Sequence, residues 1–289
     1  MSVRATVLCE NAVYGKFGYG NFGAIGEHGW SVWLETPRGE YLFDTGLGLG
    51  LLNNATVFQK DLTAAKGVLI SHHHFDHTSG LLDAMKAMRG GPSGSGVPVH
   101  AHPDLFKDSF REEKDKPRRH TGVPHTRSVL EEAGADFRLE TGWREVEEGI
   151  YMTGEVPRRT SYEIGDLNCK HYGEAGELVV DPIRDDQTVI IDTEEGLFVV
   201  LGCSHAGVIN ILTYITEKTG KSRFHTVMGG THLGPVEEDQ ITKSIAALHE
   251  FDIGRIGVSH CTGQKVAARM AAEFGERFFF CSVGSKVEV

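Results

Sequence analysis

Short apolar runs of strand length alternate along the chain with amphipathic segments of helix length. Near the N-terminus, residues 3–7 alternate between apolar and polar side chains, which is typical of a β-strand. The runs 31–35 and 40–44 flank a Thr-Pro-Arg-Gly turn and predict a β-hairpin. A second hairpin is predicted for 188–192 and 197–201, which flank a Glu-Glu-Gly sequence.

Four segments repeat apolar residues with the period of a helix. In one of them, Val208, Ile211, Leu212 and Ile215 fall at positions i, i+3, i+4 and i+7 of a single face. The predicted helices are 78–88, 208–215, 241–248 and 266–274. Further short apolar runs predict strands at 66–70, 97–100, 225–228, 255–259 and 278–283. This alternation predicts one α/β domain over residues 1–289, in which helices cover strand-rich layers.

Two glycine-rich stretches and one charged stretch interrupt the pattern. Residues 11–29 are predicted to form a long loop, and 90–96 a flexible connection. The segment 104–127 is highly charged, with seven lysines and arginines against four acidic residues between Lys107 and Arg127. We expect this segment to be a solvated helical insertion. The alternative is a lid whose cations face an anionic substrate.

Composition narrows the classes of protein that the chain can represent. Of 289 residues, 40% are hydrophobic and 24% are charged, which is ordinary for a globular protein. The formal net charge of -11 argues against binding to nucleic acid, and no run of 18 apolar residues is present to cross a membrane. The N-terminus lacks the apolar stretch of a signal peptide and the five cysteines are scattered, so we expect a cytoplasmic protein. The sequence does not indicate its oligomeric state. The 15 histidines direct attention to metal chemistry.

The strongest chemical signal is Ser71-His72-His73-His74-Phe75-Asp76-His77, which follows a predicted strand and precedes a predicted helix. Alternate residues of an extended loop point the same way, so His72 and His74 can hold one ion while His73 points away. Asp76 and His77 can hold a second ion where the chain turns into the helix. Imidazole and carboxylate ligands suit two divalent ions, with zinc as our first expectation and manganese or iron as alternatives.

This motif resembles the metal-binding loop of the metallo-β-lactamase superfamily. Three further motifs stand in that superfamily's order along the chain: Phe43-Asp44-Thr45-Gly46, Gly202-Cys203-Ser204-His205 and Val258-Ser259-His260-Cys261. The resemblance implies a four-layer αβ/βα sandwich with the metals at the sheet edges, and an Asp44 that shapes the metal loop. The implied ligands are His72, His74 and His205 for the first ion, and Asp76, His77 and His260 for the second.

One position departs from the superfamily's pattern. A bridging Asp usually lies between the third and the last metal motif, but this chain has Gly230 at the expected place. His232 lies two residues further on and can replace it as a ligand of the second ion, or it can serve as a hydrogen-bonding residue of the site. Loss of the carboxylate removes a negative charge between two cations, so we expect a weaker second ion or one completed by a substrate anion.

A narrower resemblance links the chain to one subfamily. It rests on Glu27–Ser31, Val156–Thr160, Asp185–Gln187, Gly202–Asn210, Gly229–Leu233 and His260–Gly263. That archaeal and bacterial group includes a dihydropterin–ribofuranosylaminobenzene-phosphate synthase, and many other members are metal-dependent hydrolases. The resemblance places His28 near the site as a substrate-binding candidate. Activity within the group is not uniform, so the subfamily does not fix the substrate.

Several other side chains are candidates for secondary roles. Arg158 and Arg159 form a pair that can clamp a phosphate or carboxylate, or remain two solvated cations. His120 and His125 of the charged segment are expected at the surface. We expect Cys203 and Cys261, which flank metal motifs, to be small buried side chains that fill space.

Two functions suit this set of residues. In the first, the protein is a metal-dependent hydrolase in which the ions supply an activated water to an ester or phosphoester of a small anionic substrate, with Asp76 and His232 as catalytic residues. In the second, which the subfamily implies, it is a transferase that joins a dihydropterin diphosphate to a ribofuranosylaminobenzene phosphate and releases pyrophosphate. A non-catalytic binding protein is disfavoured, because at least six ligand-type side chains are retained.

Overall fold

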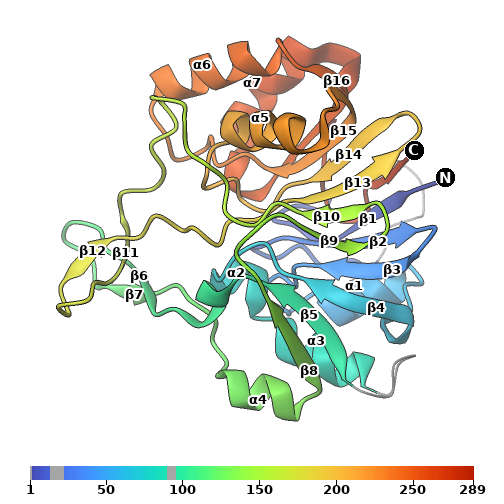
Figure 1. Cartoon of the computed structure of the whole chain (residues 1–289), viewed down its shortest axis with the longest axis vertical. Coiled ribbons are helices and arrows are strands. Elements are labelled where there is room, and N and C mark those ends of the chain that lie inside the picture. Colours follow the sequence, from blue (N-terminus) through green and yellow to red (C-terminus); the bar gives the residue numbers. More distant parts are fainter. Residues whose placement is uncertain (1, 14–22, 90–95) are drawn as a thin grey trace.

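The computed structural model describes residues 2–13, 23–89 and 96–289, so the predicted loop 11–29 lies partly outside the described residues and the connection 90–96 almost wholly so. Two seven-stranded sheets lie face to face, and helices cover the outer face of each (Figure 1). This is the four-layer αβ/βα sandwich that the sequence predicts.

The first sheet has the strand order β18-β1-β2-β3-β4-β5-β8. Strands β18, β1, β2 and β3 pair antiparallel with one another, and β3, β4, β5 and β8 pair parallel. The predicted N-terminal hairpin is β2 and β3, with Thr36 opposite Gly39 at the turn. The bounds of the strands are β1 Arg4–Cys9, β2 Ser31–Thr36, β3 Gly39–Phe43, β4 Ala65–Leu69, β5 Val97–Ala101, β8 Ala135–Leu139 and β18 Lys286–Glu288.

The second sheet has the order β17-β16-β15-β14-β13-β10-β9. Strands β14 to β17 are parallel, whereas β13 and β14 form the second predicted hairpin. The sequence analysis assigned no strands to 135–152, which supplies an edge strand to each sheet. The bounds are β9 Arg144–Glu147, β10 Ile150–Met152, β13 Val189–Thr193, β14 Gly196–Val200, β15 Arg223–Gly230, β16 Asp252–Ser259 and β17 Phe278–Phe280.

The four predicted helices all form, and each covers a sheet. Helices α1, α3 and α4 lie on the first sheet and α5, α6 and α7 on the second (Figure 1). Among the described residues, no helix is long and apolar enough to cross a membrane. The bounds are α1 Leu51–Val57, α2 Phe75–Thr78, α3 Leu81–Met88, α4 Arg127–Glu132, α5 Val208–Thr219, α6 Glu238–Leu248 and α7 Gln264–Phe274, with 3-10 turns η2 Leu62–Ala64, η3 Pro103–Phe106, η4 His260–Thr262 and η5 Gly275–Arg277.

Three apolar clusters fill the spaces between the layers. On β1, Val7 belongs to the cluster between the two sheets, and its neighbour Leu8 belongs to the cluster beneath the helices of the first sheet. The inner strands are therefore buried on both faces, which is why their apolar runs are nearly continuous. Full burial of each such side chain contributes about 1.5–3 kcal/mol. This rigid double layer holds the loops at its edge in place.

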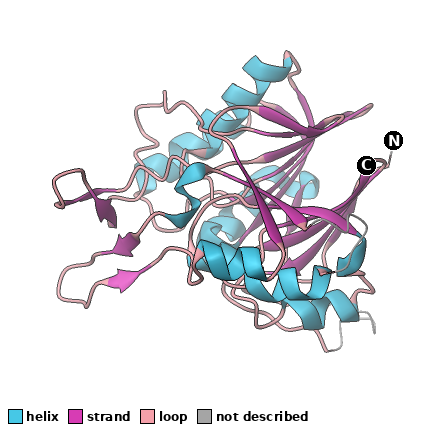
Figure 2. Ribbon diagram, turned by 60° about the horizontal axis from the view of Figure 1, so that its bottom comes forward, coloured by secondary structure: helices cyan, strands magenta, loops and turns pink. Residues whose placement is uncertain are grey.

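A third, four-stranded sheet projects from the sandwich at one edge (Figures 1 and 2). It comprises β6 Ser109–Arg111, β7 Arg119–His120, β11 Cys169–Tyr172 and β12 Leu178–Val180. The expected helix in 104–127 is wrong: the segment forms η3 and two strands. Phe110 of β6 packs edge-on against His120 and Tyr172, so aromatic contacts across strands stabilise this sheet. The helical expectation rested on charge alone, without an apolar period of 3.6.

Candidate metal centre

The candidate ligands lie on loops that follow four strands and, for Asp76 and His77, in helix α2. The loop 71–74 follows β4, while His205, His232 and His260 follow β14, β15 and β16. The three parallel strands of the second sheet end at the same edge, so the loops that follow them converge. The first sheet meets them there, because the backbone N–H of Gln187 donates to the carbonyl oxygen of Ser71 over 2.9 Å.

Four non-glycine residues at this edge adopt left-handed backbone angles. The φ values are 52° at Asp44, 61° at Ser204, 51° at His232 and 48° at His260. Such conformations are costly for residues with a Cβ atom and persist where the surrounding structure enforces them. They aim consecutive side chains of the tight loops towards one place.

His72, His74 and His205 come together as a first group of buried imidazoles. One ring nitrogen from each lies within 4.8 Å of the others, and Nε2 of His72 is 3.1 Å from Nδ1 of His74. Among the described residues, Nε2 of His74 and both ring nitrogens of His205 are buried without a hydrogen-bond partner. Buried ring nitrogens normally have partners, so Nε2 of His74 and one of the two ring nitrogens of His205 fit a divalent metal ion as their partner.

Burial also keeps these rings neutral. It lowers the pKa of His72 and His205 well below the ordinary value and that of His74 to about 3, and the neighbouring imidazoles add to the effect. A neutral imidazole has a lone pair available for a metal ion at pH 7. The donor chemistry of the first group therefore suits zinc or a similar ion.

Asp76, His260 and His28 form a second group that faces the same cavity. Oδ2 of Asp76 lies 3.2 Å from Nε2 of His260 and 3.1 Å from Nε2 of His28. Burial opposes the charge on Asp76, but the hydrogen bonds from His260 and His28 hold its pKa well below the ordinary value. Asn11 ties the two rings together, with Oδ1 2.8 Å from Nδ1 of His260 and Nδ2 3.2 Å from Nδ1 of His28.

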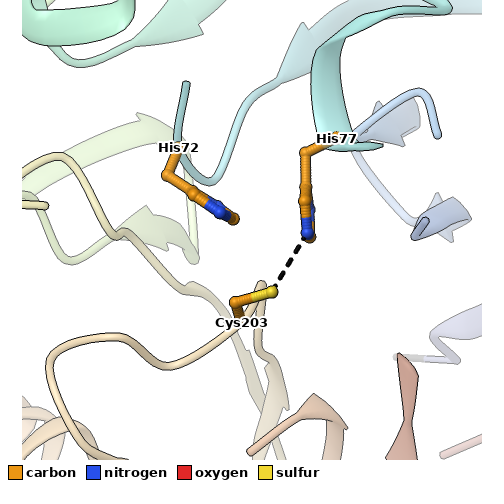
Figure 3. A group of neighbouring side chains, drawn as sticks. All are labelled: His72, His77 and Cys203. Atoms are coloured by element: carbon orange, nitrogen blue, oxygen red, sulfur yellow. Dashed lines mark hydrogen bonds between the residues drawn. The ribbon is translucent and has the colours of Figure 1, made fainter. Parts of the chain in front are cut away.

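His77 lies between the two groups and next to a cysteine. Its Nε2 is 3.1 Å from Sγ of Cys203, and Nε2 or Nδ1 of His72 lies within 4.8 Å of both (Figure 3). Although burial lowers its pKa, the charge of Asp44 and the hydrogen bond to it raise the pKa of His77 to about 9. The ring centroids of His77 and His260 are 5.3 Å apart.

His232 sits closer to the first group than to the second. Its ring centroid is 4.3 Å from that of His205, and burial lowers its pKa to about 4. The resemblance offered His232 as a substitute for the bridging carboxylate of the second ion. The structure places its ring beside that of His205, a ligand candidate of the first ion.

Hydrogen bonds behind the candidate ligands fix their orientation. Oδ2 of Asp44 lies 2.7 Å from Nδ1 of His77 and accepts from the hydroxyl of Ser71 over 2.6 Å. That hydroxyl lies 2.9 Å from Nδ1 of His72. These contacts engage the Nδ1 atoms and leave the Nε2 atoms towards the site, as outer partners of metal-binding histidines do.

His73 is directed to an acidic residue outside the first group, as the alternation of the loop predicts, although its ring centroid lies 4.7 Å from that of His74. Its backbone N–H donates to Oδ2 of Asp185 over 2.7 Å, and its Nδ1 lies 2.8 Å from the same oxygen. Lys107 of the charged segment donates to Asp181 over 2.8 Å and lies 3.9 Å from Asp185. This buried network links the metal loop to the base of the third sheet.

A cavity of about 320 Å³ opens over both groups. The third sheet forms its opposite wall through Arg111, Arg119 and His120, and Asp166 lies beside them. Arg111 donates to Asp166 over 2.6 Å, whereas Arg119 is 66% exposed and approaches Glu113 only to 3.9 Å. His120, expected at the surface, is partly exposed and also lines this cavity.

The structure does not bring the arginine pair into this cavity. Arg159 is paired with Glu217 of α5 and lines a separate hollow on the outer face of that helix. Arg158 donates to the carbonyl oxygen of Pro182. Both guanidinium groups have partners within the chain. The place of the pair directly after a proline in the sequence therefore did not predict where the two side chains lie.

The sequence analysis missed several residues that surround the site. Glu10 and Asn11 follow β1 directly, and Oε1 of Glu10 accepts from the backbone N–H of His260 over 2.8 Å. The sequence signal that could have identified both residues is a pair of polar side chains directly after a buried strand. For Arg111 and Arg119, the sequence supported only the general hypothesis that the charged segment forms a cationic lid.

The fold and the histidine-rich site together define a protein of the metallo-β-lactamase type. The chain belongs to the beta-lactamase superfamily. A profile described as the beta-lactamase superfamily domain matches residues 40–147. Tm1679, a metal-dependent hydrolase of the beta-lactamase superfamily, is 30% identical in sequence, with a TM-score of 0.81 over 99% of each chain.

Two further proteins resemble the chain over most of its length. The 7,8-dihydropterin-6-methyl-4-(beta-D-ribofuranosyl)-aminobenzene-5'-phosphate synthase of Methanocaldococcus jannaschii is 29% identical over 259 residues, which are 87% of this chain and 86% of the relative. The metallo-beta-lactamase fold protein YhfI from Bacillus subtilis is 10% identical, with a TM-score of 0.58 over 99% of each chain, and shows the fold alone.

Proposed function

We propose that this protein is a dinuclear metal-dependent hydrolase that cleaves an ester or phosphoester bond of a small anionic substrate, with zinc as the resident metal. The observation that carries the proposal is the set of buried ring nitrogens on His74 and His205 that have no hydrogen-bond partner in the described part of the chain; both side chains line one cavity with Asp76 and His260. No serine or cysteine elbow is needed for such a reaction.

The candidate ligands divide between two ions. His72, His74 and His205 would hold the first, and Asp76, His77 and His260 the second. When bound, such ions polarise the scissile group and bring the pKa of a coordinated water towards neutrality.

The five cysteines form no disulfide bonds, which supports the expected location in the reducing cytoplasm.

The residues of the chain that surround the ions have separate tasks. Asp76, whose Oδ2 lies 3.1 Å from Nε2 of His28, is fixed as an acceptor that orients the attacking nucleophile. His28 is 55% exposed and lines the cavity, so it can contact substrate as well as Asp76. His232 lines the cavity beside His205, where it would face the reacting group.

The cationic wall of the cavity supports an anionic substrate. Arg111 is engaged by Asp166 and Glu113, but Arg119 is more exposed and more loosely paired. A guanidinium group is suited to bidentate binding of phosphate or carboxylate. Arg119 of the third sheet therefore takes the role that the sequence had suggested for Arg158 and Arg159.

The test combines metal analysis with assays on the full chain. Elemental analysis after purification without added metal would be followed by assays on a phosphodiester, a phosphomonoester and a lactone, with and without chelator. We expect chelator-sensitive hydrolysis that His205→Ala reduces by at least about 100-fold, together with its metal content. His249→Ala, on the exposed end of α6, is the matched control and should retain both. Hydrolysis unaffected by chelator would contradict the proposal.

A transferase is the second candidate, and the synthase of Methanocaldococcus jannaschii favours it because it matches 87% of this chain. In such a reaction a pterin methylene–oxygen bond would break, pyrophosphate would leave, and a carbon–nitrogen bond to the amino group of the aminobenzene would form with loss of an N–H proton. Metal-loaded protein that hydrolyses none of the three ester probes but releases pyrophosphate from a dihydropterin diphosphate, only when the aminobenzene partner is present, would select this function.

A further inference from the structure

We propose that Cys203 is a metal ligand, and that its thiolate supplies the negative charge that a bridging Asp supplies elsewhere in the superfamily. The inference rests on the metal centre of the proposed function and concerns the side chain that completes it. It assigns a chemical role to a cysteine that the sequence analysis took for a space-filling residue.

The geometry around the sulfur is that of a ligand group. Sγ of Cys203 and one ring nitrogen each of His72 and His77 lie within 4.8 Å of one another, and all three residues are buried. Figure 3 shows the sulfur and the two rings directed towards a common space, with Sγ 3.1 Å from Nε2 of His77. Imidazole nitrogen and thiolate sulfur both bind zinc in proteins.

The surroundings of Cys203 differ from those of a cysteine that fills apolar space. Cys9 and Cys281 each belong to an apolar core cluster, whereas Cys203 belongs to none of the three clusters in the described part of the chain. It lies instead among imidazoles at the floor of the cavity. The thiol of Cys203 therefore lies beside nitrogen atoms of the candidate metal site and not beside methyl groups of the apolar core.

Gly230 provides a second, independent observation. A Cβ atom built on Gly230 would lie 2.6 Å from Sγ of Cys261, 2.6 Å from the carbonyl oxygen of Gly202 and 3.3 Å from Cα of Cys203. The space into which an Asp at this position would extend is therefore filled by the Cys261 sulfur and by the backbone of Gly202 and Cys203. Position 230 therefore cannot supply the bridging carboxylate, and the Cys203 thiolate, beside His72 and His77, supplies a negative charge in its stead.

The binding step is balanced by release of one proton. The Cys203 thiol gives up its proton to solvent as the sulfur–metal bond forms, and no oxidant or reductant takes part. A thiolate is a soft ligand, so this site should favour zinc over manganese or magnesium. A site made of His72, His74, His205 and Asp76 without the thiolate would discriminate less between these ions.

The experiment uses the full chain loaded with cobalt or zinc. The cobalt form should show a near-ultraviolet sulfur-to-metal charge-transfer band that Cys203→Ser abolishes and Cys261→Ser retains. X-ray absorption of the zinc form of the unaltered protein should show a sulfur neighbour at about 2.3 Å, a result that does not depend on how a variant folds. Alkylation of Cys203, measured by mass spectrometry, should fall at least tenfold on metal loading.

The outcomes separate this inference from the proposed function. Protein that binds two ions and hydrolyses an ester, but shows only nitrogen and oxygen neighbours around zinc, would overturn the role of Cys203 and leave the hydrolase intact. A charge-transfer band that persists in Cys203→Ser would also overturn it. Protein that takes up no metal would contradict both.

Discussion

Oδ2 of Asp44 lies 2.7 Å from Nδ1 of His77, in a pair that is wholly buried at the end of β3. The same carboxylate accepts from the backbone N–H of Ser71 over 2.7 Å and from its hydroxyl over 2.6 Å. One aspartate thus sets both the course of the metal loop and the tautomer of His77, whose Nε2 is directed at Cys203. Asp44 positions ligands and does not face the cavity itself.

The first prediction concerns this positioning. Asp44→Asn should lower zinc affinity by about 10–100-fold, because the His77 ring loses its charged partner and is free to turn. Asp61→Asn, which alters a carboxylate that accepts from Thr63 in a remote turn, is the matched control. Calorimetric titration of metal-free protein measures both. Equal affinities of the two variants would show that Asp44 supports only the fold.

The second prediction concerns the cationic wall. Arg119→Ala should raise KM for an anionic ester roughly tenfold with metal content unchanged, because one charge-assisted hydrogen bond contributes about 1.5–3 kcal/mol. Arg118→Ala removes the adjacent cation, which is paired with Glu112 and does not line the cavity. Steady-state kinetics of both variants against the unaltered protein provide the measurement. A similar rise in KM for both would indicate a general effect of charge rather than a contact.

The third prediction concerns Gly230. Gly230→Ala should lower the free energy of unfolding by about 1–3 kcal/mol, because the new methyl group would meet the backbone oxygen of Gly202, which cannot move aside as a flexible side chain can. Gly142→Ala has open space around its Cβ and should be near neutral. Chemical denaturation of metal-free protein compares the two. If Gly230→Ala is as stable as Gly142→Ala, then the cysteines do not fill that space firmly.

Sequence reasoning was most successful where the signal was local. The run 71–77 carries its ligands within one loop, and strand alternation alone separated His73 from His72 and His74. The resemblance to the superfamily placed the loops of His205 and His260 beside the run 71–77. Parallel strands end at the same edge of a sheet, so the loops that follow them lie close together. Hairpins and helices followed from periods of two and 3.6 residues in the same way.

Sequence reasoning failed where the outcome depends on contacts between distant segments. Asn11 reaches His260 across 249 positions of the chain, and no local pattern announces that contact. Arg159 was placed by its neighbours in sequence, but its partner Glu217 lies on α5. The charged segment became strands because β11, some sixty residues later, supplies a partner for β6. Cys203 is buried as expected, but it lies beside His77 rather than in one of the three apolar clusters of the described residues.

The last prediction concerns Asp186, a buried carboxyl at the base of the site. Its Oδ2 accepts from the backbone N–H of Ala206 over 2.9 Å, and Oδ1 has no hydrogen-bond partner among the described residues. Burial raises its pKa to about 7, against an ordinary 3.8; the neighbouring Asp185 adds to the rise, and Arg158 opposes it. The folded protein therefore holds this proton over a range of pH in which the unfolded chain has released it.

The sign of the effect on stability follows from that difference. The contribution of Asp186 is fully present below about pH 4, falls as pH rises and is lost above about pH 7, with a total of up to roughly 4 kcal/mol. Asp186→Asn cannot ionise, so its stability advantage over the unaltered protein should widen from pH 4 to pH 7 and then stay constant. Denaturation of metal-free protein at several pH values measures this, with Asp239→Asn on the exposed face of α6 as control. Parallel curves for Asp186→Asn and the unaltered protein would show that Asp186 is ionised in the folded state.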